Sequence, residues 1–122
     1  MAGNPVGWFE IYVDDMRRAR TFYEAVLSIR LERLDAAVEM WAFPMRAEKA
    51  GAPGALVRMD GFRAGGNSTI VYFTCDDCAT EARRAADHGG RVVKDRFAIG
   101  RHGHIALVLD TEGNMIGLHS MR

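Results

Sequence analysis

Residues 7–27 read GWFEIYVDDMRRARTFYEAVL, and this stretch decides the fold. Its opening part alternates with the period of a β-strand, with one face formed by Phe9, Ile11 and Val13 and the other by Trp8, Glu10 and Tyr12. Asp14 or Asp15 then offers a carboxylate cap for a helix. That helix places its apolar residues on one side, namely Ala19, Phe22, Tyr23, Val26 and Leu27. The stretch therefore predicts a strand whose Phe9 face packs under an amphipathic helix.

The same pattern returns about half the chain later, in residues 68–90, STIVYFTCDDCATEARRAADHGG. Asp76-Asp77 takes the place of Asp14-Asp15. The helix expected after it carries small residues that allow close approach to a sheet, namely Ala79, Ala82, Ala85 and Ala86. Gly89-Gly90 suits a left-handed stop. Self-similarity at this spacing indicates a duplicated module.

Each module is expected to continue with three strands. In the first module the strand-like runs are residues 30–34, 38–43 and 55–59, and in the second they are residues 91–94, 104–109 and 115–119. Residues 44–54 contain prolines and glycines and read as a mobile loop. Residues 61–67 are glycine-rich and suit a connector, and residues 110–114 have the chemistry of a hairpin turn. Each module is thus predicted to be strand, helix and three strands.

Composition narrows the classes of function. The chain has 122 residues, enough for one domain and too few for two independently stable ones. Sixteen basic and sixteen acidic residues balance without runs of like charge, so we expect no nucleic-acid partner. No stretch has the length of a membrane span or the pattern of a signal peptide, so we expect no membrane partner and a cytoplasmic location. Cys75 and Cys78 suit a reducing compartment and are expected to be thiols.

The order βαβββ repeated twice, the opening VDDM followed by ARTFYEAVL, and the closing DTEGNMIGLH at residues 110–119 resemble the vicinal oxygen chelate superfamily. That superfamily includes glyoxalase I, extradiol dioxygenases, and fosfomycin and bleomycin resistance proteins. The resemblance implies an α+β fold in one domain over residues 1–122, with modules at about 5–61 and 67–121. It also implies a cup-shaped mixed sheet with helices outside, and a homodimer.

Metal-dependent members of that superfamily hold a divalent ion with His and Glu side chains from four strands. Carried onto this chain, three of those positions are Trp8, Ile70 and Gly117, none of which has a metal-ligating atom. The fourth lies on residues 55–59, where Arg58 is the polar side chain. The resemblance therefore implies no metal cofactor. The alternative is one divalent ion held by displaced ligands such as Glu10, His104 and His119.

Two sets of residues are candidates for the site. Glu10 and His119 each lie one step deeper along their strands than a lost ligand, and side by side they would form a catalytic acid and base pair. The alternative is that they satisfy each other as buried polar groups. The candidate ligand-binding residues are Trp8, Tyr12, Trp41, Arg58 and Tyr72, which would stack a flat organic molecule. The alternative for these aromatic residues is ordinary core.

A possible zinc or redox motif has weaker support than these two sets. Cys75 and Cys78 match Cys-x-x-Cys, and with His102 and His104 they would give four zinc ligands on paper, but these lie on separate predicted elements. The first hypothesis is a metal-independent small-molecule binding protein of the bleomycin resistance type. The second is an enzyme of the same superfamily, either a lyase or dioxygenase with displaced metal ligands or a metal-free isomerase using Glu10 and His119. The third is a subunit whose role is contact with another protein.

Overall fold

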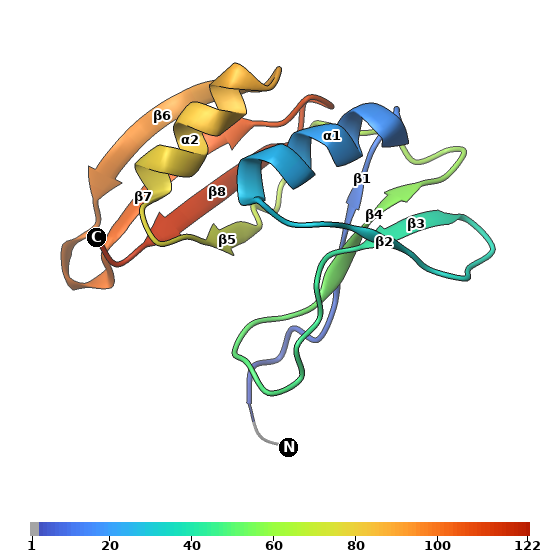
Figure 1. Cartoon of the computed structure of the whole chain (residues 1–122), viewed down its shortest axis with the longest axis horizontal. Helices are drawn as coiled ribbons and strands as arrows, with labels where there is room; N and C mark the ends of the chain where they lie inside the picture. The colour runs from blue at the N-terminus through green and yellow to red at the C-terminus, as the bar shows by residue number, and fades with distance from the viewer. Residues whose placement is uncertain (1–2) are drawn as a thin grey trace.

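The computed structural model describes residues 3–122 and shows an α+β fold of two similar halves (Figure 1). The first half contains β1 (Phe9–Tyr12), α1 (Met16–Leu27), β2 (Glu32–Arg33), β3 (Glu39–Ala42) and β4 (Gly54–Arg58). The second contains β5 (Tyr72–Thr74), α2 (Cys78–Asp87), β6 (Arg91–Ala98), a 3₁₀ turn η1 (Gly100–His102), β7 (His104–Leu109) and β8 (Met115–Ser120). The βαβββ order predicted for each module is confirmed.

The strands form two four-stranded mixed sheets with the same order. The first sheet is β1-β4-β3-β2 and the second is β5-β8-β7-β6. In each sheet the first strand of the module pairs in parallel with the last, and the other pairs are antiparallel. β6 is longer than expected and reaches Ala98 through irregular pairing with β7. The expected mixed sheet is therefore divided into one sheet for each module.

The two helices begin at the acidic pairs. The Asp15 carboxylate accepts a hydrogen bond from the Arg18 amide at 3.1 Å, and the Asp77 carboxylate accepts one from the Ala79 amide at 3.1 Å. α1 is capped at its end by Ser28, which is left-handed, with a φ of 53°. α2 is capped at its end by His88, which is followed by Gly89 with a φ of 94°. Within the described residues, no helix is long and apolar enough to cross a membrane.

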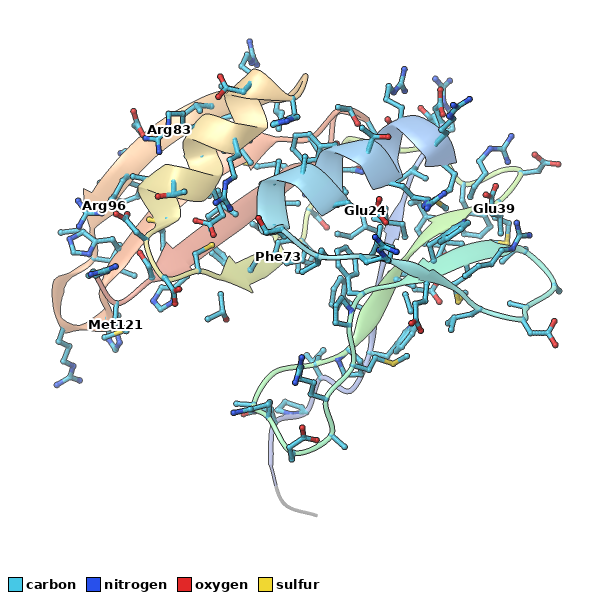
Figure 2. The ribbon with its side chains drawn as sticks, viewed as in Figure 1. Glu24, Glu39, Phe73, Arg83, Arg96 and Met121 are labelled. Carbon is cyan, nitrogen blue, oxygen red and sulfur yellow. The ribbon has the colours of Figure 1, made fainter. Side chains whose placement is uncertain are left out.

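The core lies between the helices and one face of each sheet. One cluster of buried residues includes members of both halves, such as Ile11 and Leu56 from the first and Ile116 and Leu118 from the second. Phe73 lies near the centre of the molecule (Figure 2), with its ring centroid 5.4 Å from that of Phe43. The opposite face of each sheet carries no helix (Figure 1), and we call it the open face.

The turn between β7 and β8 joins the two halves through hydrogen bonds. Asp110 accepts bonds from the amides of Glu112 and Asn114, both at 2.8 Å, and from the Tyr23 hydroxyl at 2.6 Å. Asn114 donates to the Tyr12 carbonyl at 3.0 Å and accepts from the Gly65 amide at 2.6 Å. The buried polar groups of this turn are thus satisfied by contacts to β1, α1 and the connector.

Glu112 completes this junction between the halves. Its carboxylate accepts bonds from the amides of Asp14 and Asp15 at 3.0 and 2.8 Å. It also pairs with the Arg18 guanidinium through two bonds, at 2.6 and 2.9 Å. A bidentate pair of this kind fixes orientation as well as distance. The turn therefore sets how α1 is placed against the second sheet.

Candidate functional site

A hydrogen-bonded row lies on the open face of the first sheet. It consists of Glu10 and Tyr12 of β1 and of Trp8, which precedes β1. The Glu10 carboxylate accepts from Trp8 Nε1 at 3.1 Å and from the Tyr12 hydroxyl at 2.7 Å. Strand alternation brings these residues to one face because they are two positions apart. The hydrogen bond to Glu10, together with burial, raises the pKa of Tyr12 above its usual value, so its hydroxyl stays a donor. The carboxylate is held between two aromatic side chains.

Phe62 extends this row from the connector. Its ring stacks on Tyr12 with centroids 5.2 Å apart and an angle of 25° between the planes. Phe62 is 52% exposed and Trp8 is 38% exposed. Phe62 was not among the residues predicted from the sequence, because it lies in a glycine-rich segment. Its one signal was an aromatic residue in a connector that is otherwise small and polar.

On the second sheet, Tyr72 lies over Gly117. The two residues are partners across the parallel β5 and β8 strands, on the open face. A Cβ atom at position 117 would collide with the Tyr72 ring. The ring can lie here only because residue 117 is glycine. Tyr72 is 46% exposed. The ring of Tyr72 thus covers the position that the resemblance assigned to a metal ligand.

His119 is oriented by the turn before β7. Its Nε2 lies 2.6 Å from the backbone oxygen of His102. A carbonyl oxygen accepts only, so Nε2 carries the proton and Nδ1 of the neutral ring is an acceptor. Thr74 and Ile105 are its partners across the strands, so the ring belongs to the open face of the second sheet. His119 is therefore half-buried, and its Nδ1 takes no part in the bond to His102.

Glu10 and His119 do not form the pair that the sequence suggested. They lie on strands of different sheets, and their polar partners differ, Trp8 and Tyr12 for Glu10 and His102 for His119. No hydrogen bond or ion pair of the described residues joins them. The hypothesis that they satisfy each other is not met in this structure either.

Two of the expected ligand-binding residues belong to the other face of the first sheet. Trp41 pairs with Leu56 of the core, and the Arg20 guanidinium from α1 lies 3.4 Å from the centre of its ring. Arg58 is two residues beyond Leu56 on the same face and bonds to Asp60 at 2.9 Å. The open face of β4 is instead formed by Ala55 and Val57. Trp41 and Arg58 therefore do not lie beside Trp8 as the sequence suggested, because this register places them on the opposite face of the sheet.

The displaced metal ligands are not gathered. Glu10 belongs to the first sheet, His119 to the open face of the second, and His104 pairs with Ser120 on the helix-facing side. Nδ1 of His104 is buried without a hydrogen-bond partner. Among the residues that the structure describes, no three His, Cys, Asp or Glu side chains lie together as a metal-binding group.

Two hollows lie outside the row formed by Trp8, Glu10 and Tyr12. One, of about 600 Å³, lies beside β2 and the end of β3 and is lined by the open-face residues Glu32 and Ala42 together with Arg30, Phe43 and Met45. The other, of about 340 Å³, lies between the start of α1 and the end of α2 and includes Arg17, Arg18 and His88. Neither contains a candidate site residue. The aromatic row on the open face is the better candidate, because its exposed rings and oriented carboxylate suit an organic ligand.

The two cysteines belong to the core. Cys75 Sγ lies 3.5 Å from the Phe73 carbonyl oxygen, and both thiols are buried and unbridged. Burial raises the pKa of the Cys75 thiol to about 12, and the nearby Glu81 carboxylate adds to the effect. A thiol in this state is a poor nucleophile and metal ligand.

Comparison with known proteins identifies the family. A sequence profile of the Glyoxalase/Bleomycin resistance protein/Dioxygenase superfamily matches residues 6–118. The chain belongs to this superfamily, as its repeated βαβββ order and closing motif indicated. No curated protein sequence is significantly similar to the chain.

Several solved structures share the fold. A glyoxalase I mutant from Zea mays is 19% identical with a TM-score of 0.74, over 96% of this chain and 46% of that one. A glyoxalase/bleomycin resistance protein from Albidiferax ferrireducens is 17% identical with a TM-score of 0.72, over 94% of this chain and 98% of that one. TnmS3, an antibiotic binding protein from a Streptomyces species, is 24% identical with a TM-score of 0.70, over 98% of each chain. At these identities the likeness shows the fold.

Proposed function

We propose that the protein binds a small, flat organic molecule against the open faces of its sheets, without a metal ion and without making or breaking a bond. The observation that carries the proposal is the set of exposed aromatic rings on these faces, namely Trp8, Phe62 and Tyr72, with the half-buried Tyr12 stacked against Phe62. Aromatic rings that a folded chain leaves uncovered are typical of ligand and partner sites. They offer stacking surfaces rather than catalytic groups.

The chemistry of the former chelate positions supports a metal-free site. Trp8, Ile70 and Gly117 have no metal-ligating atoms, and the open face of β4 adds only Ala55 and Val57. At position 117 the Tyr72 ring takes the space of a ligand side chain. Replacement of ligands by aromatic surface favours stacking of an organic molecule over coordination. TnmS3, with the same fold, is described as an antibiotic binding protein, which agrees with this direction.

A second copy of the chain is part of the proposal. Bound organic ligands commonly lose 70–90% of their surface to the protein, whereas the aromatic rings here stand on open faces rather than in a hollow of one chain. Association of two copies would cover the exposed rings and supply further walls. We expect a homodimer by light scattering at micromolar concentration, and a monomer would leave the ligand on an open surface.

An enzyme is the second candidate, and His119 is the observation that favours it. The bond from Nε2 to the His102 carbonyl fixes the ring and leaves Nδ1 as an acceptor, as a general base requires. Against it, Glu10 makes no hydrogen bond or ion pair with His119 among the described residues and has different partners. His119→Ala distinguishes the candidates, because it should abolish turnover in an enzyme and leave stacking on Trp8 in a binder.

The two tryptophans provide a direct test of the binding face. Flat aromatic compounds, including metal-free bleomycin, are titrated into EDTA-treated protein while tryptophan fluorescence and binding heat are recorded. In Trp41→Phe the remaining Trp8 should still be quenched by the ligand. In Trp8→Phe the remaining Trp41, which faces α1, should not respond. Quenching that follows Trp41 instead, or no binding by any compound, would overturn the proposal.

A further inference from the structure

Resting on the proposed function, we infer that the ligand carries a positive charge and that Glu10 receives it. The open face of the first sheet is a receptor for an organic cation, such as an amine or quaternary nitrogen attached to a flat ring. The inference concerns the class of ligand, and it depends on the arrangement of charges and rings around one carboxylate.

Glu10 has acceptor capacity left over. Each carboxylate oxygen accepts one hydrogen bond, Oε1 from Tyr12 and Oε2 from Trp8. A carboxylate offers about four lone-pair directions, so both oxygens can accept again. The side chain is exposed, and no ion pair among the described residues includes it. Its charge is therefore oriented but not neutralised by the protein.

Strand alternation turns the basic side chains of the strands themselves away from this face, and Arg30 and Arg46 lie near Glu32 at its β2 and β3 edge, outside the strands. In the first sheet, Arg33 pairs with Trp41 and Arg58 pairs with Glu39, which places both arginines on the helix-facing side. The same register places Glu32 opposite Ala42 and Glu10 opposite Ala55, both on the open face. Across the strand residues of this sheet, the charged groups of the open face are thus both acidic.

The aromatic residues strengthen the preference for a cation. Trp8 and Tyr12 flank the carboxylate, and Phe62 stacks on Tyr12. The face of an aromatic ring attracts a cation, and an ammonium group bonded to a carboxylate gains a charge-assisted hydrogen bond as well. The second sheet differs, because its open face carries Lys94 and His119. The charge preference therefore belongs to the first sheet and to Glu10.

A set of three probes of one shape tests the inference. 1-Naphthylmethylammonium, 1-naphthylmethanol and 1-naphthoate are cationic, neutral and anionic at neutral pH, and their affinities are measured by ligand-observed NMR in EDTA at low salt. The cation should bind about tenfold more tightly than the alcohol, with the anion weakest. Glu10→Gln removes the charge but keeps one oxygen that can accept from Trp8, while its amide nitrogen can donate to the Tyr12 hydroxyl. The cation should therefore lose its advantage while the alcohol binds as before.

Glu32→Gln is the matched control, since it removes the other acid of the same open face and should change the ratio of affinities by less than Glu10→Gln does. Equal binding of cation and alcohol to the unaltered protein would overturn this inference and leave the proposed function standing. Loss of alcohol binding in Glu10→Gln, with an unchanged thermal midpoint, would also overturn it, because Glu10 would then act by holding the rings. Absence of binding by all three probes would overturn both proposals.

Discussion

The hydroxyl of Tyr23 on α1 donates a 2.6 Å hydrogen bond to Asp110 Oδ2 at the turn between β7 and β8. Tyr23 is fully buried, and its ring packs edge-on against Phe43 with centroids 5.7 Å apart. One side chain thus serves the aromatic core and the polar junction of the two halves. The stability of the whole chain should depend on this bond.

Tyr23→Phe tests that dependence. The substitution keeps the ring and removes the donor, leaving a buried carboxylate oxygen with one partner fewer, so the free energy of unfolding should fall by about 1–3 kcal/mol. Urea denaturation measures the change. Tyr12→Phe is the control on the exposed row, where we expect a change of about 0.5 kcal/mol or less. Equal effects of the two substitutions would contradict the role given to the buried bond.

Glu112 predicts a loss of stability in acid. Burial works against its charge, but bonds from Arg18, the Asp15 amide, Thr111 and the Asp14 amide outweigh it and lower its pKa. An acid whose pKa is lower in the folded state stabilises the folded protein at pH values above its pKa in the unfolded chain. That stability is lost as the pH falls through the pKa of the folded state. Asp110, whose pKa burial raises, has the opposite sign and offsets part of the loss.

Denaturation midpoints of wild type and Glu112→Gln, measured from about pH 6 down to about pH 3, check this prediction. The variant should start less stable because it loses the ion pair with Arg18. It should then lose less stability than wild type as the pH falls. If the midpoints of the two proteins fell equally as the pH was lowered, Glu112 would not be the cause of the loss of stability in acid.

Two glycines should differ in their tolerance of a methyl group. A Cβ at position 54 would collide with the Phe9 ring inside the core, and one at position 117 would collide with the exposed Tyr72 ring. Gly54→Ala should therefore destabilise by about 1–3 kcal/mol, as overpacked cores do. Gly117→Ala should destabilise less, because Tyr72 can swing into solvent, and it should weaken ligand binding. The reverse order of destabilisation would contradict the assignment of the two faces.

The thiols should be slow to react. Both cysteines are buried, and burial raises the pKa of Cys75 to about 12, so little thiolate forms near neutral pH. We expect the native protein to resist a thiol-specific disulfide reagent and to react at both cysteines once unfolded in urea. Rapid labelling of the native protein at either cysteine would contradict the buried state.

The sequence predicted the fold well because its strongest signals are local. The acidic pairs do cap both helices, and the alternation of residues 8–13 places Trp8, Glu10 and Tyr12 on one face. The family and the repeated strand order follow from the same motifs. Such signals depend on neighbours in the chain, which a sequence shows directly.

The candidate site was harder to predict because it depends on register between strands. Residues 38–43 and 55–59 are largely apolar on both faces, so alternation does not tell which face holds Trp41 or Arg58. Pairing of Trp41 with Leu56 decides it. The contact of Phe62 with Tyr12 is likewise a tertiary contact made by a connector. Glu10 and His119 belong to different sheets and do not bond to each other, and periodicity does not encode how two sheets are placed.

The most direct test of the account is ligand affinity with and without metal. The purified protein is treated with EDTA, one portion is incubated with zinc, nickel, manganese and ferrous iron and desalted, and the metal content and affinity for a flat organic cation are measured in both. We predict only trace metal in either portion, equal affinities, and weaker binding in both for Trp8→Ala. Near one equivalent of retained metal, with binding that requires it and is lost in His119→Ala, would contradict the account.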